Sequence, residues 1–115
     1  MSLTEAQLKR QIEDYLTYRQ NAGDLMWFPM NSGKAFVKRG GKDYMIQLCD
    51  EGTADLLILR KWKGGVFCEV LFFELKSDRG RTSSAQNAFK ILVEEQGASY
   101  SIVRSLEELE KILGI

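Results

Sequence analysis

The sequence predicts an α/β domain in which a mixed β-sheet carries helices on both faces. Apolar residues recur at helical spacing near both ends of the chain, with strand-like runs between them. The two central runs, Thr53–Leu59 and Val70–Lys76, are apolar on both sides, which is typical of strands covered on both faces. Because 115 residues suffice for one hydrophobic core, we expect a single domain over residues 1–115.

The N-terminal half is predicted to hold one helix and several short strands. Residues from about Ser2 to Arg19 have an amphipathic helical pattern, with a possible capping box at Ser2–Glu5. A buried strand at Leu25–Phe28 should end at Pro29, the only proline. After a turn at Asn31–Gly33, we expect a short strand at Lys34–Lys38, a basic hairpin turn at Arg39–Asp43, and a strand at Tyr44–Leu48.

The C-terminal half is predicted to alternate helix, strand and helix. Ser83 should cap a helix that runs to Gln96 and ends at Gly97. A strand at Tyr100–Val103 follows, and Ser105 should cap a closing helix with Glu108 at the capping-box position. The apolar faces of these two helices are expected at Ala85, Ala88, Phe89, Leu92 and Val93, and at Leu106, Leu109, Ile112 and Leu113.

Composition excludes several classes of chemistry. The chain has no histidine, which rules out Ser-His-Asp and Cys-His catalysis, histidine acid–base catalysis and histidine-bound zinc. Cys49 and Cys68 lack metal-binding spacing, and reduced thiols in a cytoplasmic protein are the simplest interpretation. No segment has a secretory or membrane-spanning pattern. The 16 basic and 16 acidic residues balance, which argues against tight non-specific DNA binding but permits a local basic groove.

The two central strands are predicted to form a hairpin. Gly64 and Gly65 lie between them, and Gly-Gly is a two-residue hairpin signal. If Lys63 pairs with Val66, an aromatic pair (Trp62 and Phe67) and a charge pair (Arg60 and Glu69) face each other across the strands. These favourable pairs support the register.

The same register places Asp55 opposite Glu74, where two carboxylates would repel each other. Lys76 lies two residues beyond Glu74 and therefore shares its face. Convergent carboxylates of this kind suit Mg²⁺ or Mn²⁺, so a metal site is one interpretation. The other is that these are ordinary acidic residues at strand ends, and a β-bulge would break the register.

Three segments resemble the VRR-NUC nucleases, the virus-type replication–repair members of the PD-(D/E)xK superfamily, in their stand-alone phage and bacterial form. The segments are Gly52–Leu57, Phe73–Lys76 and Gly80–Gln86, and the similarity extends from Glu5 to the closing helix at Ser105–Glu108. Ala54 departs from the pattern, since the superfamily name has proline there. The resemblance implies a restriction-endonuclease-like core.

The resemblance also implies a catalytic site for Mg²⁺- or Mn²⁺-dependent phosphodiester hydrolysis. Its metal ligands would be Asp55, Glu74, the backbone carbonyl of Leu75, and Glu5; Lys76 and Gln86 would complete the catalytic set. Two of these residues have a second interpretation from the sequence itself. Glu5 and Gln86 each occupy the last position of a possible capping box, at Ser2–Glu5 and Ser83–Gln86.

Two groups of cations are candidate DNA-binding residues. The densest basic cluster in the sequence is Lys34, Lys38, Arg39 and Lys42; Arg79 and Arg81 lie in the loop that should project over the carboxylates. Arginine and lysine bind phosphate well, yet such charges also commonly do no more than solvate a loop.

As in the family it resembles, the chain is expected to be a structure-selective endonuclease that cuts branched DNA such as a four-way junction or a flapped duplex. It would act as a homodimer without a membrane, in the cytoplasm of a bacterial or phage-infected cell. A non-catalytic DNA-binding module of the same fold is the alternative function, and a structural or protein-interaction domain would account for the zero net charge. The latter leaves the opposed carboxylates without a purpose.

Overall fold

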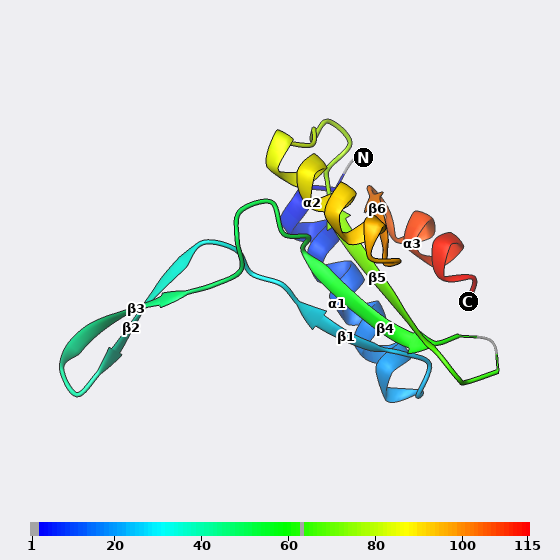
Figure 1. The fold of residues 1–115 in the computed structure, drawn as a ribbon, viewed down its shortest axis with the longest axis horizontal. Helices are drawn as coiled ribbons and strands as arrows, with labels where there is room; N and C mark the ends of the chain where they lie inside the picture. Colours follow the sequence, from blue (N-terminus) through cyan, green and yellow to red (C-terminus); the bar gives the residue numbers. More distant parts are fainter. Residues whose placement is uncertain (1–2, 63) are drawn as a thin grey trace.

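A computed structural model describes residues 3–62 and 64–115 (Figure 1). The elements follow the order expected from the sequence. They are α1 (Glu5–Asn21), β1 (Met26–Pro29), β2 (Lys34–Arg39), β3 (Lys42–Gln47), β4 (Leu56–Lys61), β5 (Cys68–Leu75), α2 (Ser84–Glu95), β6 (Ser99–Val103) and α3 (Leu106–Leu113). Within these ranges, no helix is both long and apolar enough to cross a bilayer.

Four strands form a mixed sheet in the order β1-β4-β5-β6. The first three pair antiparallel, and β6 joins β5 in parallel after the α2 crossover. The hairpin register is the expected one: Arg60 lies opposite Glu69, and Trp62 N donates to Phe67 O at 2.8 Å. The expected partner of Val66, Lys63, lies outside the described residues. The predicted α/β class with a mixed, helix-flanked sheet is therefore confirmed.

One face of this sheet carries the hydrophobic core. Alternate residues of β5 point to it, and Phe73 and Leu75 are almost wholly buried there. Helices α1 and α3 cover this face, each through its own apolar stripe. The fully enclosed residues of the two helices are Leu8, Ile12 and Leu16 in α1, with Leu109 and Leu113 in α3.

The opposite face is covered by α2, and far less completely. Phe89 of α2 packs edge-on against Phe72 and Tyr100 of the sheet, with ring centroids 5.2 and 6.1 Å away. No residue of α2 itself is buried. The predicted buried stripe was wrong for Ala88 and Leu92, which are exposed, because α2 contacts the sheet along a narrower line than its sequence pattern would allow.

Some predicted boundaries and contacts also need correction. Thr4 caps α1 in a capping box: its side-chain oxygen accepts from the N–H of Gln7, and the side-chain oxygen of Gln7 accepts from the N–H of Thr4. Glu5 is therefore the first helical residue and not the third. Ser2, the predicted cap, lies outside the described residues. Pro29 belongs to β1, where an edge strand tolerates the missing N–H. In α3, Ile112 is 40% exposed instead of facing the core.

Strands β2 and β3 form a separate hairpin, which we call the arm (residues 34–47). It extends away from the main sheet, and its strands contact no other helix or strand of the described chain (Figure 1). The predicted Gly-Gly turn is present: Gly40 and Gly41 have φ of 58° and 77°, as a tight turn between twisted strands requires. The segment ahead of the arm is attached to the body where Met30 N donates to the backbone oxygen of Asp55 at 2.8 Å.

Candidate active site

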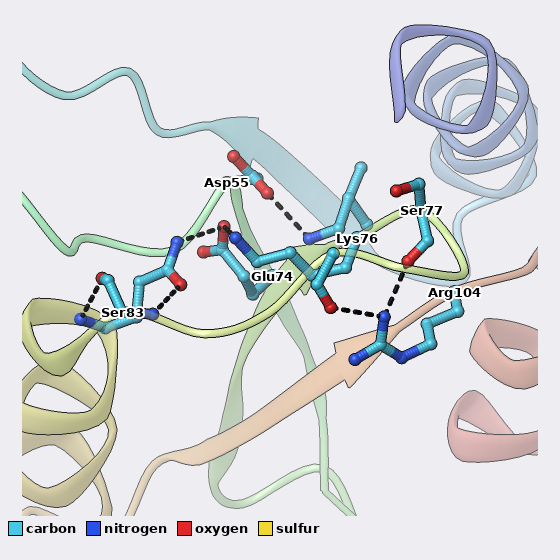
Figure 2. A network of polar contacts seen from close by, with 9 residues as sticks. Asp55, Glu74, Lys76, Ser77, Ser83 and Arg104 are labelled. Carbon is cyan, nitrogen blue, oxygen red and sulfur yellow. Dashed lines mark hydrogen bonds and ion pairs between the residues drawn. The ribbon is translucent and has the colours of Figure 1, made fainter. Parts of the chain in front are cut away.

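Two carboxylates meet at the open end of the β4–β5 hairpin. Leu56 lies opposite Phe73, so Asp55 and Glu74 come next to each other beyond the last paired residues. Asp55 is held in place because its Oδ2 accepts a hydrogen bond from the backbone N–H of Leu75 at 2.7 Å (Figure 2). Alternation along β5 places Glu74 on the α2 face of the sheet.

Glu74 is a carboxylate in an unfavourable place for a lone negative charge. It is only 4% exposed, and its Oε2 is buried with no hydrogen-bond partner among the described residues. Burial, followed by the charge of Asp55 and a hydrogen bond with that carboxyl, raises the pKa of Glu74 to about 8. Lys76 opposes this shift and the charge of Glu5 adds to it. Without a cation, Glu74 therefore holds its proton more tightly than an ordinary glutamate does.

Gln86 connects the start of α2 to this carboxylate. Its Nε2 donates to Glu74 Oε1 at 2.9 Å, while its Oε1 accepts from the backbone N–H of Ser83 at 3.0 Å. Its own N–H donates to Ser83 Oγ at 3.1 Å, completing a capping box. The two interpretations of Gln86 are thus compatible, because the two ends of one amide serve different partners.

Lys76 lies beside Glu74 without a close ion pair. Its Nζ is 3.9 Å from Glu74 Oε1, and its side chain is 14% exposed. Gly80 packs against the stem of this lysine; a Cβ on Gly80 would be 3.2 Å from Lys76 Cβ and Cδ. Arg104 holds the loop between them, since its Nη1 donates to the carbonyls of Ser77 at 2.6 Å and Gly80 at 2.8 Å (Figure 2).

Gly52 fixes the distance between α2 and the segment that leads to Asp55. It is buried with φ +91°, and a Cβ there would lie 2.5 Å from the backbone oxygen of Ala85. Only glycine allows the first turn of α2 to approach this closely. Gly52 therefore helps to place Gln86, the residue after Ala85, against Glu74.

Tyr100 of β6 lies on the α2 face of the sheet, the same face as Glu74. Its hydroxyl is buried with no hydrogen-bond partner in the described chain. Burial and the nearby charges of Glu74 and Asp55 raise the pKa of Tyr100 to about 12. The side chain is thus a neutral O–H donor next to the acidic pair.

The remaining predicted residues surround this centre at different distances. Glu5, exposed at the start of α1, influences Glu74 through its charge. The backbone of Leu75 lies in the site, since its N–H binds Asp55. Arg79 and Arg81 are exposed in the loop after β5. The four basic residues of the cluster at 34–42 lie on the arm and are exposed there.

The donor set fits a divalent metal ion such as Mg²⁺ or Mn²⁺. Two adjacent carboxylates, one with an unsatisfied buried oxygen, are hard ligands whose mutual repulsion a cation would relieve. Asp55 and Glu74 supply two such side chains; no group of three acidic or cysteine side chains positioned for a metal occurs in the described ranges. Further ligands would therefore have to be backbone oxygens, water or substrate, as Mg²⁺ commonly accepts.

Comparisons of the chain with protein-family models, curated proteins and solved structures gave no match. The candidate site therefore depends on geometry and on the motif resemblance.

Sequence reasoning missed Gly52, Tyr100 and Arg104 as residues that shape the site. A signal existed for Gly52, since a glycine in the turn just before the predicted strand at Thr53–Leu59 often has positive φ. Tyr100 and Arg104 reach the site through the parallel pairing of β6 with β5, for which the sequence carries no local signal.

Proposed function

We propose that this protein is a metal-dependent endonuclease that hydrolyses phosphodiester bonds in branched DNA. One observation carries the proposal: Asp55 and Glu74 converge with one buried, unsatisfied oxygen, and Lys76 and Gln86 lie beside them on the same face. A structural domain gains nothing from such a pair, because burying adjacent like charges opposes folding. The motif resemblance to VRR-NUC nucleases agrees with this interpretation.

Each residue has a definite task in this proposal. Asp55 and Glu74, with the Leu75 carbonyl and water, would hold one or two Mg²⁺ or Mn²⁺ ions, and Glu5 would act on this site through its charge. The metal would supply Lewis-acid polarisation of the phosphate and activation of the attacking water. Lys76 would orient that water or stabilise negative charge on the phosphate oxygens, since its ammonium is not held in a close ion pair. Gln86 keeps Glu74 in one orientation through its amide.

The DNA would be bound by shape and charge. Arg79 and Arg81 lie on the loop that follows Lys76, and the basic residues of the arm provide a second set of phosphate contacts. Four-way junctions and flapped duplexes are the proposed substrates.

The test is cleavage of a labelled four-way junction, a flap and a plain duplex with Mg²⁺, Mn²⁺ or EDTA. We expect metal-dependent cutting of the branched DNAs that is lost in Asp55→Asn and Lys76→Ala. The matched control is Lys61→Ala, which removes an exposed lysine at the opposite end of the same hairpin. Binding without cutting would instead favour the non-catalytic DNA-binding module. If the protein neither binds nor cuts these DNAs, the resemblance to the family would be limited to the fold.

We also propose a homodimer, in which two sites could cut the two strands of a junction. It is supported by an open apolar groove of about 900 Å³ between α2 and the tip of the β4–β5 hairpin. Trp62, Phe67 and Leu92 line it and are more than half exposed, an unusual apolar surface for a monomer. Light scattering should give twice the mass of one chain, and Phe67→Glu should halve it; a single-chain mass for the wild type would contradict the proposal.

A further inference from the structure

The arm presents an exposed apolar pair that the protein itself does not cover. Phe36 and Met45 lie directly opposite each other across β2 and β3, and they are 75% and 55% exposed. The strands of the arm contact no other helix or strand of the described chain. Because an isolated two-stranded sheet is only marginally stable, exposing such side chains on it brings no benefit to folding. Their exposure points to a binding partner.

Charge identifies the chemistry of that partner. Residues 34–47 contain four basic residues and one acidic residue, a net charge of +3; since the whole chain is neutral, the remainder carries −3. Alternation places Lys34 and Lys38 on the same face as Phe36, one on each side of it, with Asp43 opposite Lys38, so this face carries a net charge of +1. A partner of this face must offer negative charge next to flat apolar surface. Phosphates and bases of a nucleic acid provide both.

The shape of the arm also suits DNA. A two-stranded β-ribbon is narrow enough to enter a DNA groove, and phenylalanine and methionine are among the side chains that insert between base steps. Insertion into a continuous duplex costs a few kcal/mol of unstacking. At a branch point, base pairs already lack a stacked neighbour, so the same contact would cost much less there.

The segment that leads into the arm is attached next to the candidate active site. Met30, at its base, donates its N–H to the backbone carbonyl of Asp55 at 2.8 Å. Phe36 is six residues farther along the chain, so its Cα is at most about 22 Å from that of Met30. At 3.4 Å per base step, this reach spans up to about six steps of duplex.

We propose that Phe36 and Met45 form a wedge that stacks against the open base pair at a DNA branch point, while Lys34 and Lys38 bind the flanking phosphates. The proposal depends on the DNA substrate proposed above and explains how the arm could select branched DNA. It places the cut within about six base steps of the branch.

The test measures binding in EDTA, where no cleavage occurs, by fluorescence anisotropy on a four-way junction and on a plain duplex of equal length. We expect the double variant Phe36→Ala/Met45→Ala to weaken junction binding roughly tenfold or more, as loss of base stacking does, and to change duplex binding less than about twofold. Phe36→Tyr should restore junction binding. Tyr18→Ala, which removes an aromatic side chain that is 66% exposed on α1, is the matched control and should change neither.

Lys38→Ala separates the wedge from charge. It should weaken both DNAs alike and reduce the slope of log K against log salt concentration by about 0.9, whereas the wedge variant should leave that slope unchanged. Thermal melting of the double variant should match the wild type, because the arm packs against no other element.

Three results would overturn the wedge: equal weakening on both DNAs, unchanged junction binding, or a change from dimer to monomer in the double variant, which would assign the arm to subunit contact. Failure of the nuclease proposal would look different. If the protein binds junctions through Phe36 but never cuts them, the wedge proposal holds and the nuclease proposal fails. If the protein cuts junctions equally well without Phe36, the nuclease proposal holds and the wedge proposal fails.

Discussion

The two faces of the main sheet differ in how completely they are packed. Phe73 and Phe72 are neighbours on β5, yet Phe73 is fully enclosed beneath α1 and α3, while Phe72 is only partly covered by α2. The candidate site lies on the second face, at the end where α2 begins. The difference teaches that the face beneath α1 and α3 supplies most of the packing that stabilises the fold. The face beneath α2 can therefore carry two adjacent carboxylates whose repulsion lowers stability.

The largest expected effect is on stability, from truncating these two phenylalanines in turn. Phe73→Ala should cost about 3–5 kcal/mol of unfolding free energy, because it leaves a cavity in the closed core. Phe72→Ala should cost no more than about half of that, since its ring is already partly exposed. Urea denaturation with matched m-values measures both, and equal costs would mean that the two faces are equally well packed in solution.

Next is the catalytic side of the comparison. Glu74→Gln should reduce metal-dependent cleavage more than about a hundredfold, yet leave stability in EDTA unchanged or higher, because it removes a buried acid beside Asp55. Glu69→Gln is the matched control on the same strand: it breaks the 2.6 Å ion pair with Arg60 far from the site. It should cost some stability and no activity. The assignment of the site would be wrong if the two variants exchanged these effects.

Much of this arrangement could be predicted from sequence because it is local. The favourable pairs along β4 and β5 predict their register, and that register alone places Asp55 beside Glu74. The parallel pairing of β6, which delivers Tyr100 and Arg104, depends on a crossover with no short-range signal. Periodicity also marked Leu92 as apolar without revealing that nothing in the described chain buries it.

A smaller effect is expected from closing the narrow gap where α2 meets the site. Gly52→Ala places a Cβ 2.5 Å from Ala85 O and should cost about 1–3 kcal/mol, with a loss of cleavage as Gln86 is displaced. Gly97→Ala is the control, since Gly97 has a similar φ of +89° and open space around it. It should show the backbone strain alone, about 1 kcal/mol, with normal cleavage. Normal cleavage by Gly52→Ala would show that the position of α2 is not critical.

The last expected effect is a gradual one, the pH dependence of stability without metal. Because Glu74 has a pKa of about 8 in the folded protein and an ordinary value of 4.5, the folded state binds its proton more tightly than the unfolded chain does. Its contribution is fully present below about pH 4.5 and is lost as pH rises to 8, by at most about 1.4 kcal/mol per unit. Melting temperatures in EDTA should therefore fall across this window, and Glu74→Gln should flatten the profile.

Adding Mg²⁺ or Mn²⁺ should reverse this trend, because a cation must displace the Glu74 proton and so binds better as pH rises. The stabilisation by metal should increase from pH 5 to pH 8 in the wild type and vanish in Glu74→Gln, while Glu69→Gln should behave like the wild type. A wild-type profile that is flat in EDTA and insensitive to metal would mean that Asp55 and Glu74 do not interact as closely as their positions indicate. The face covered by α2 would then differ from the core face in packing alone, and not in carrying two carboxylates that repel each other.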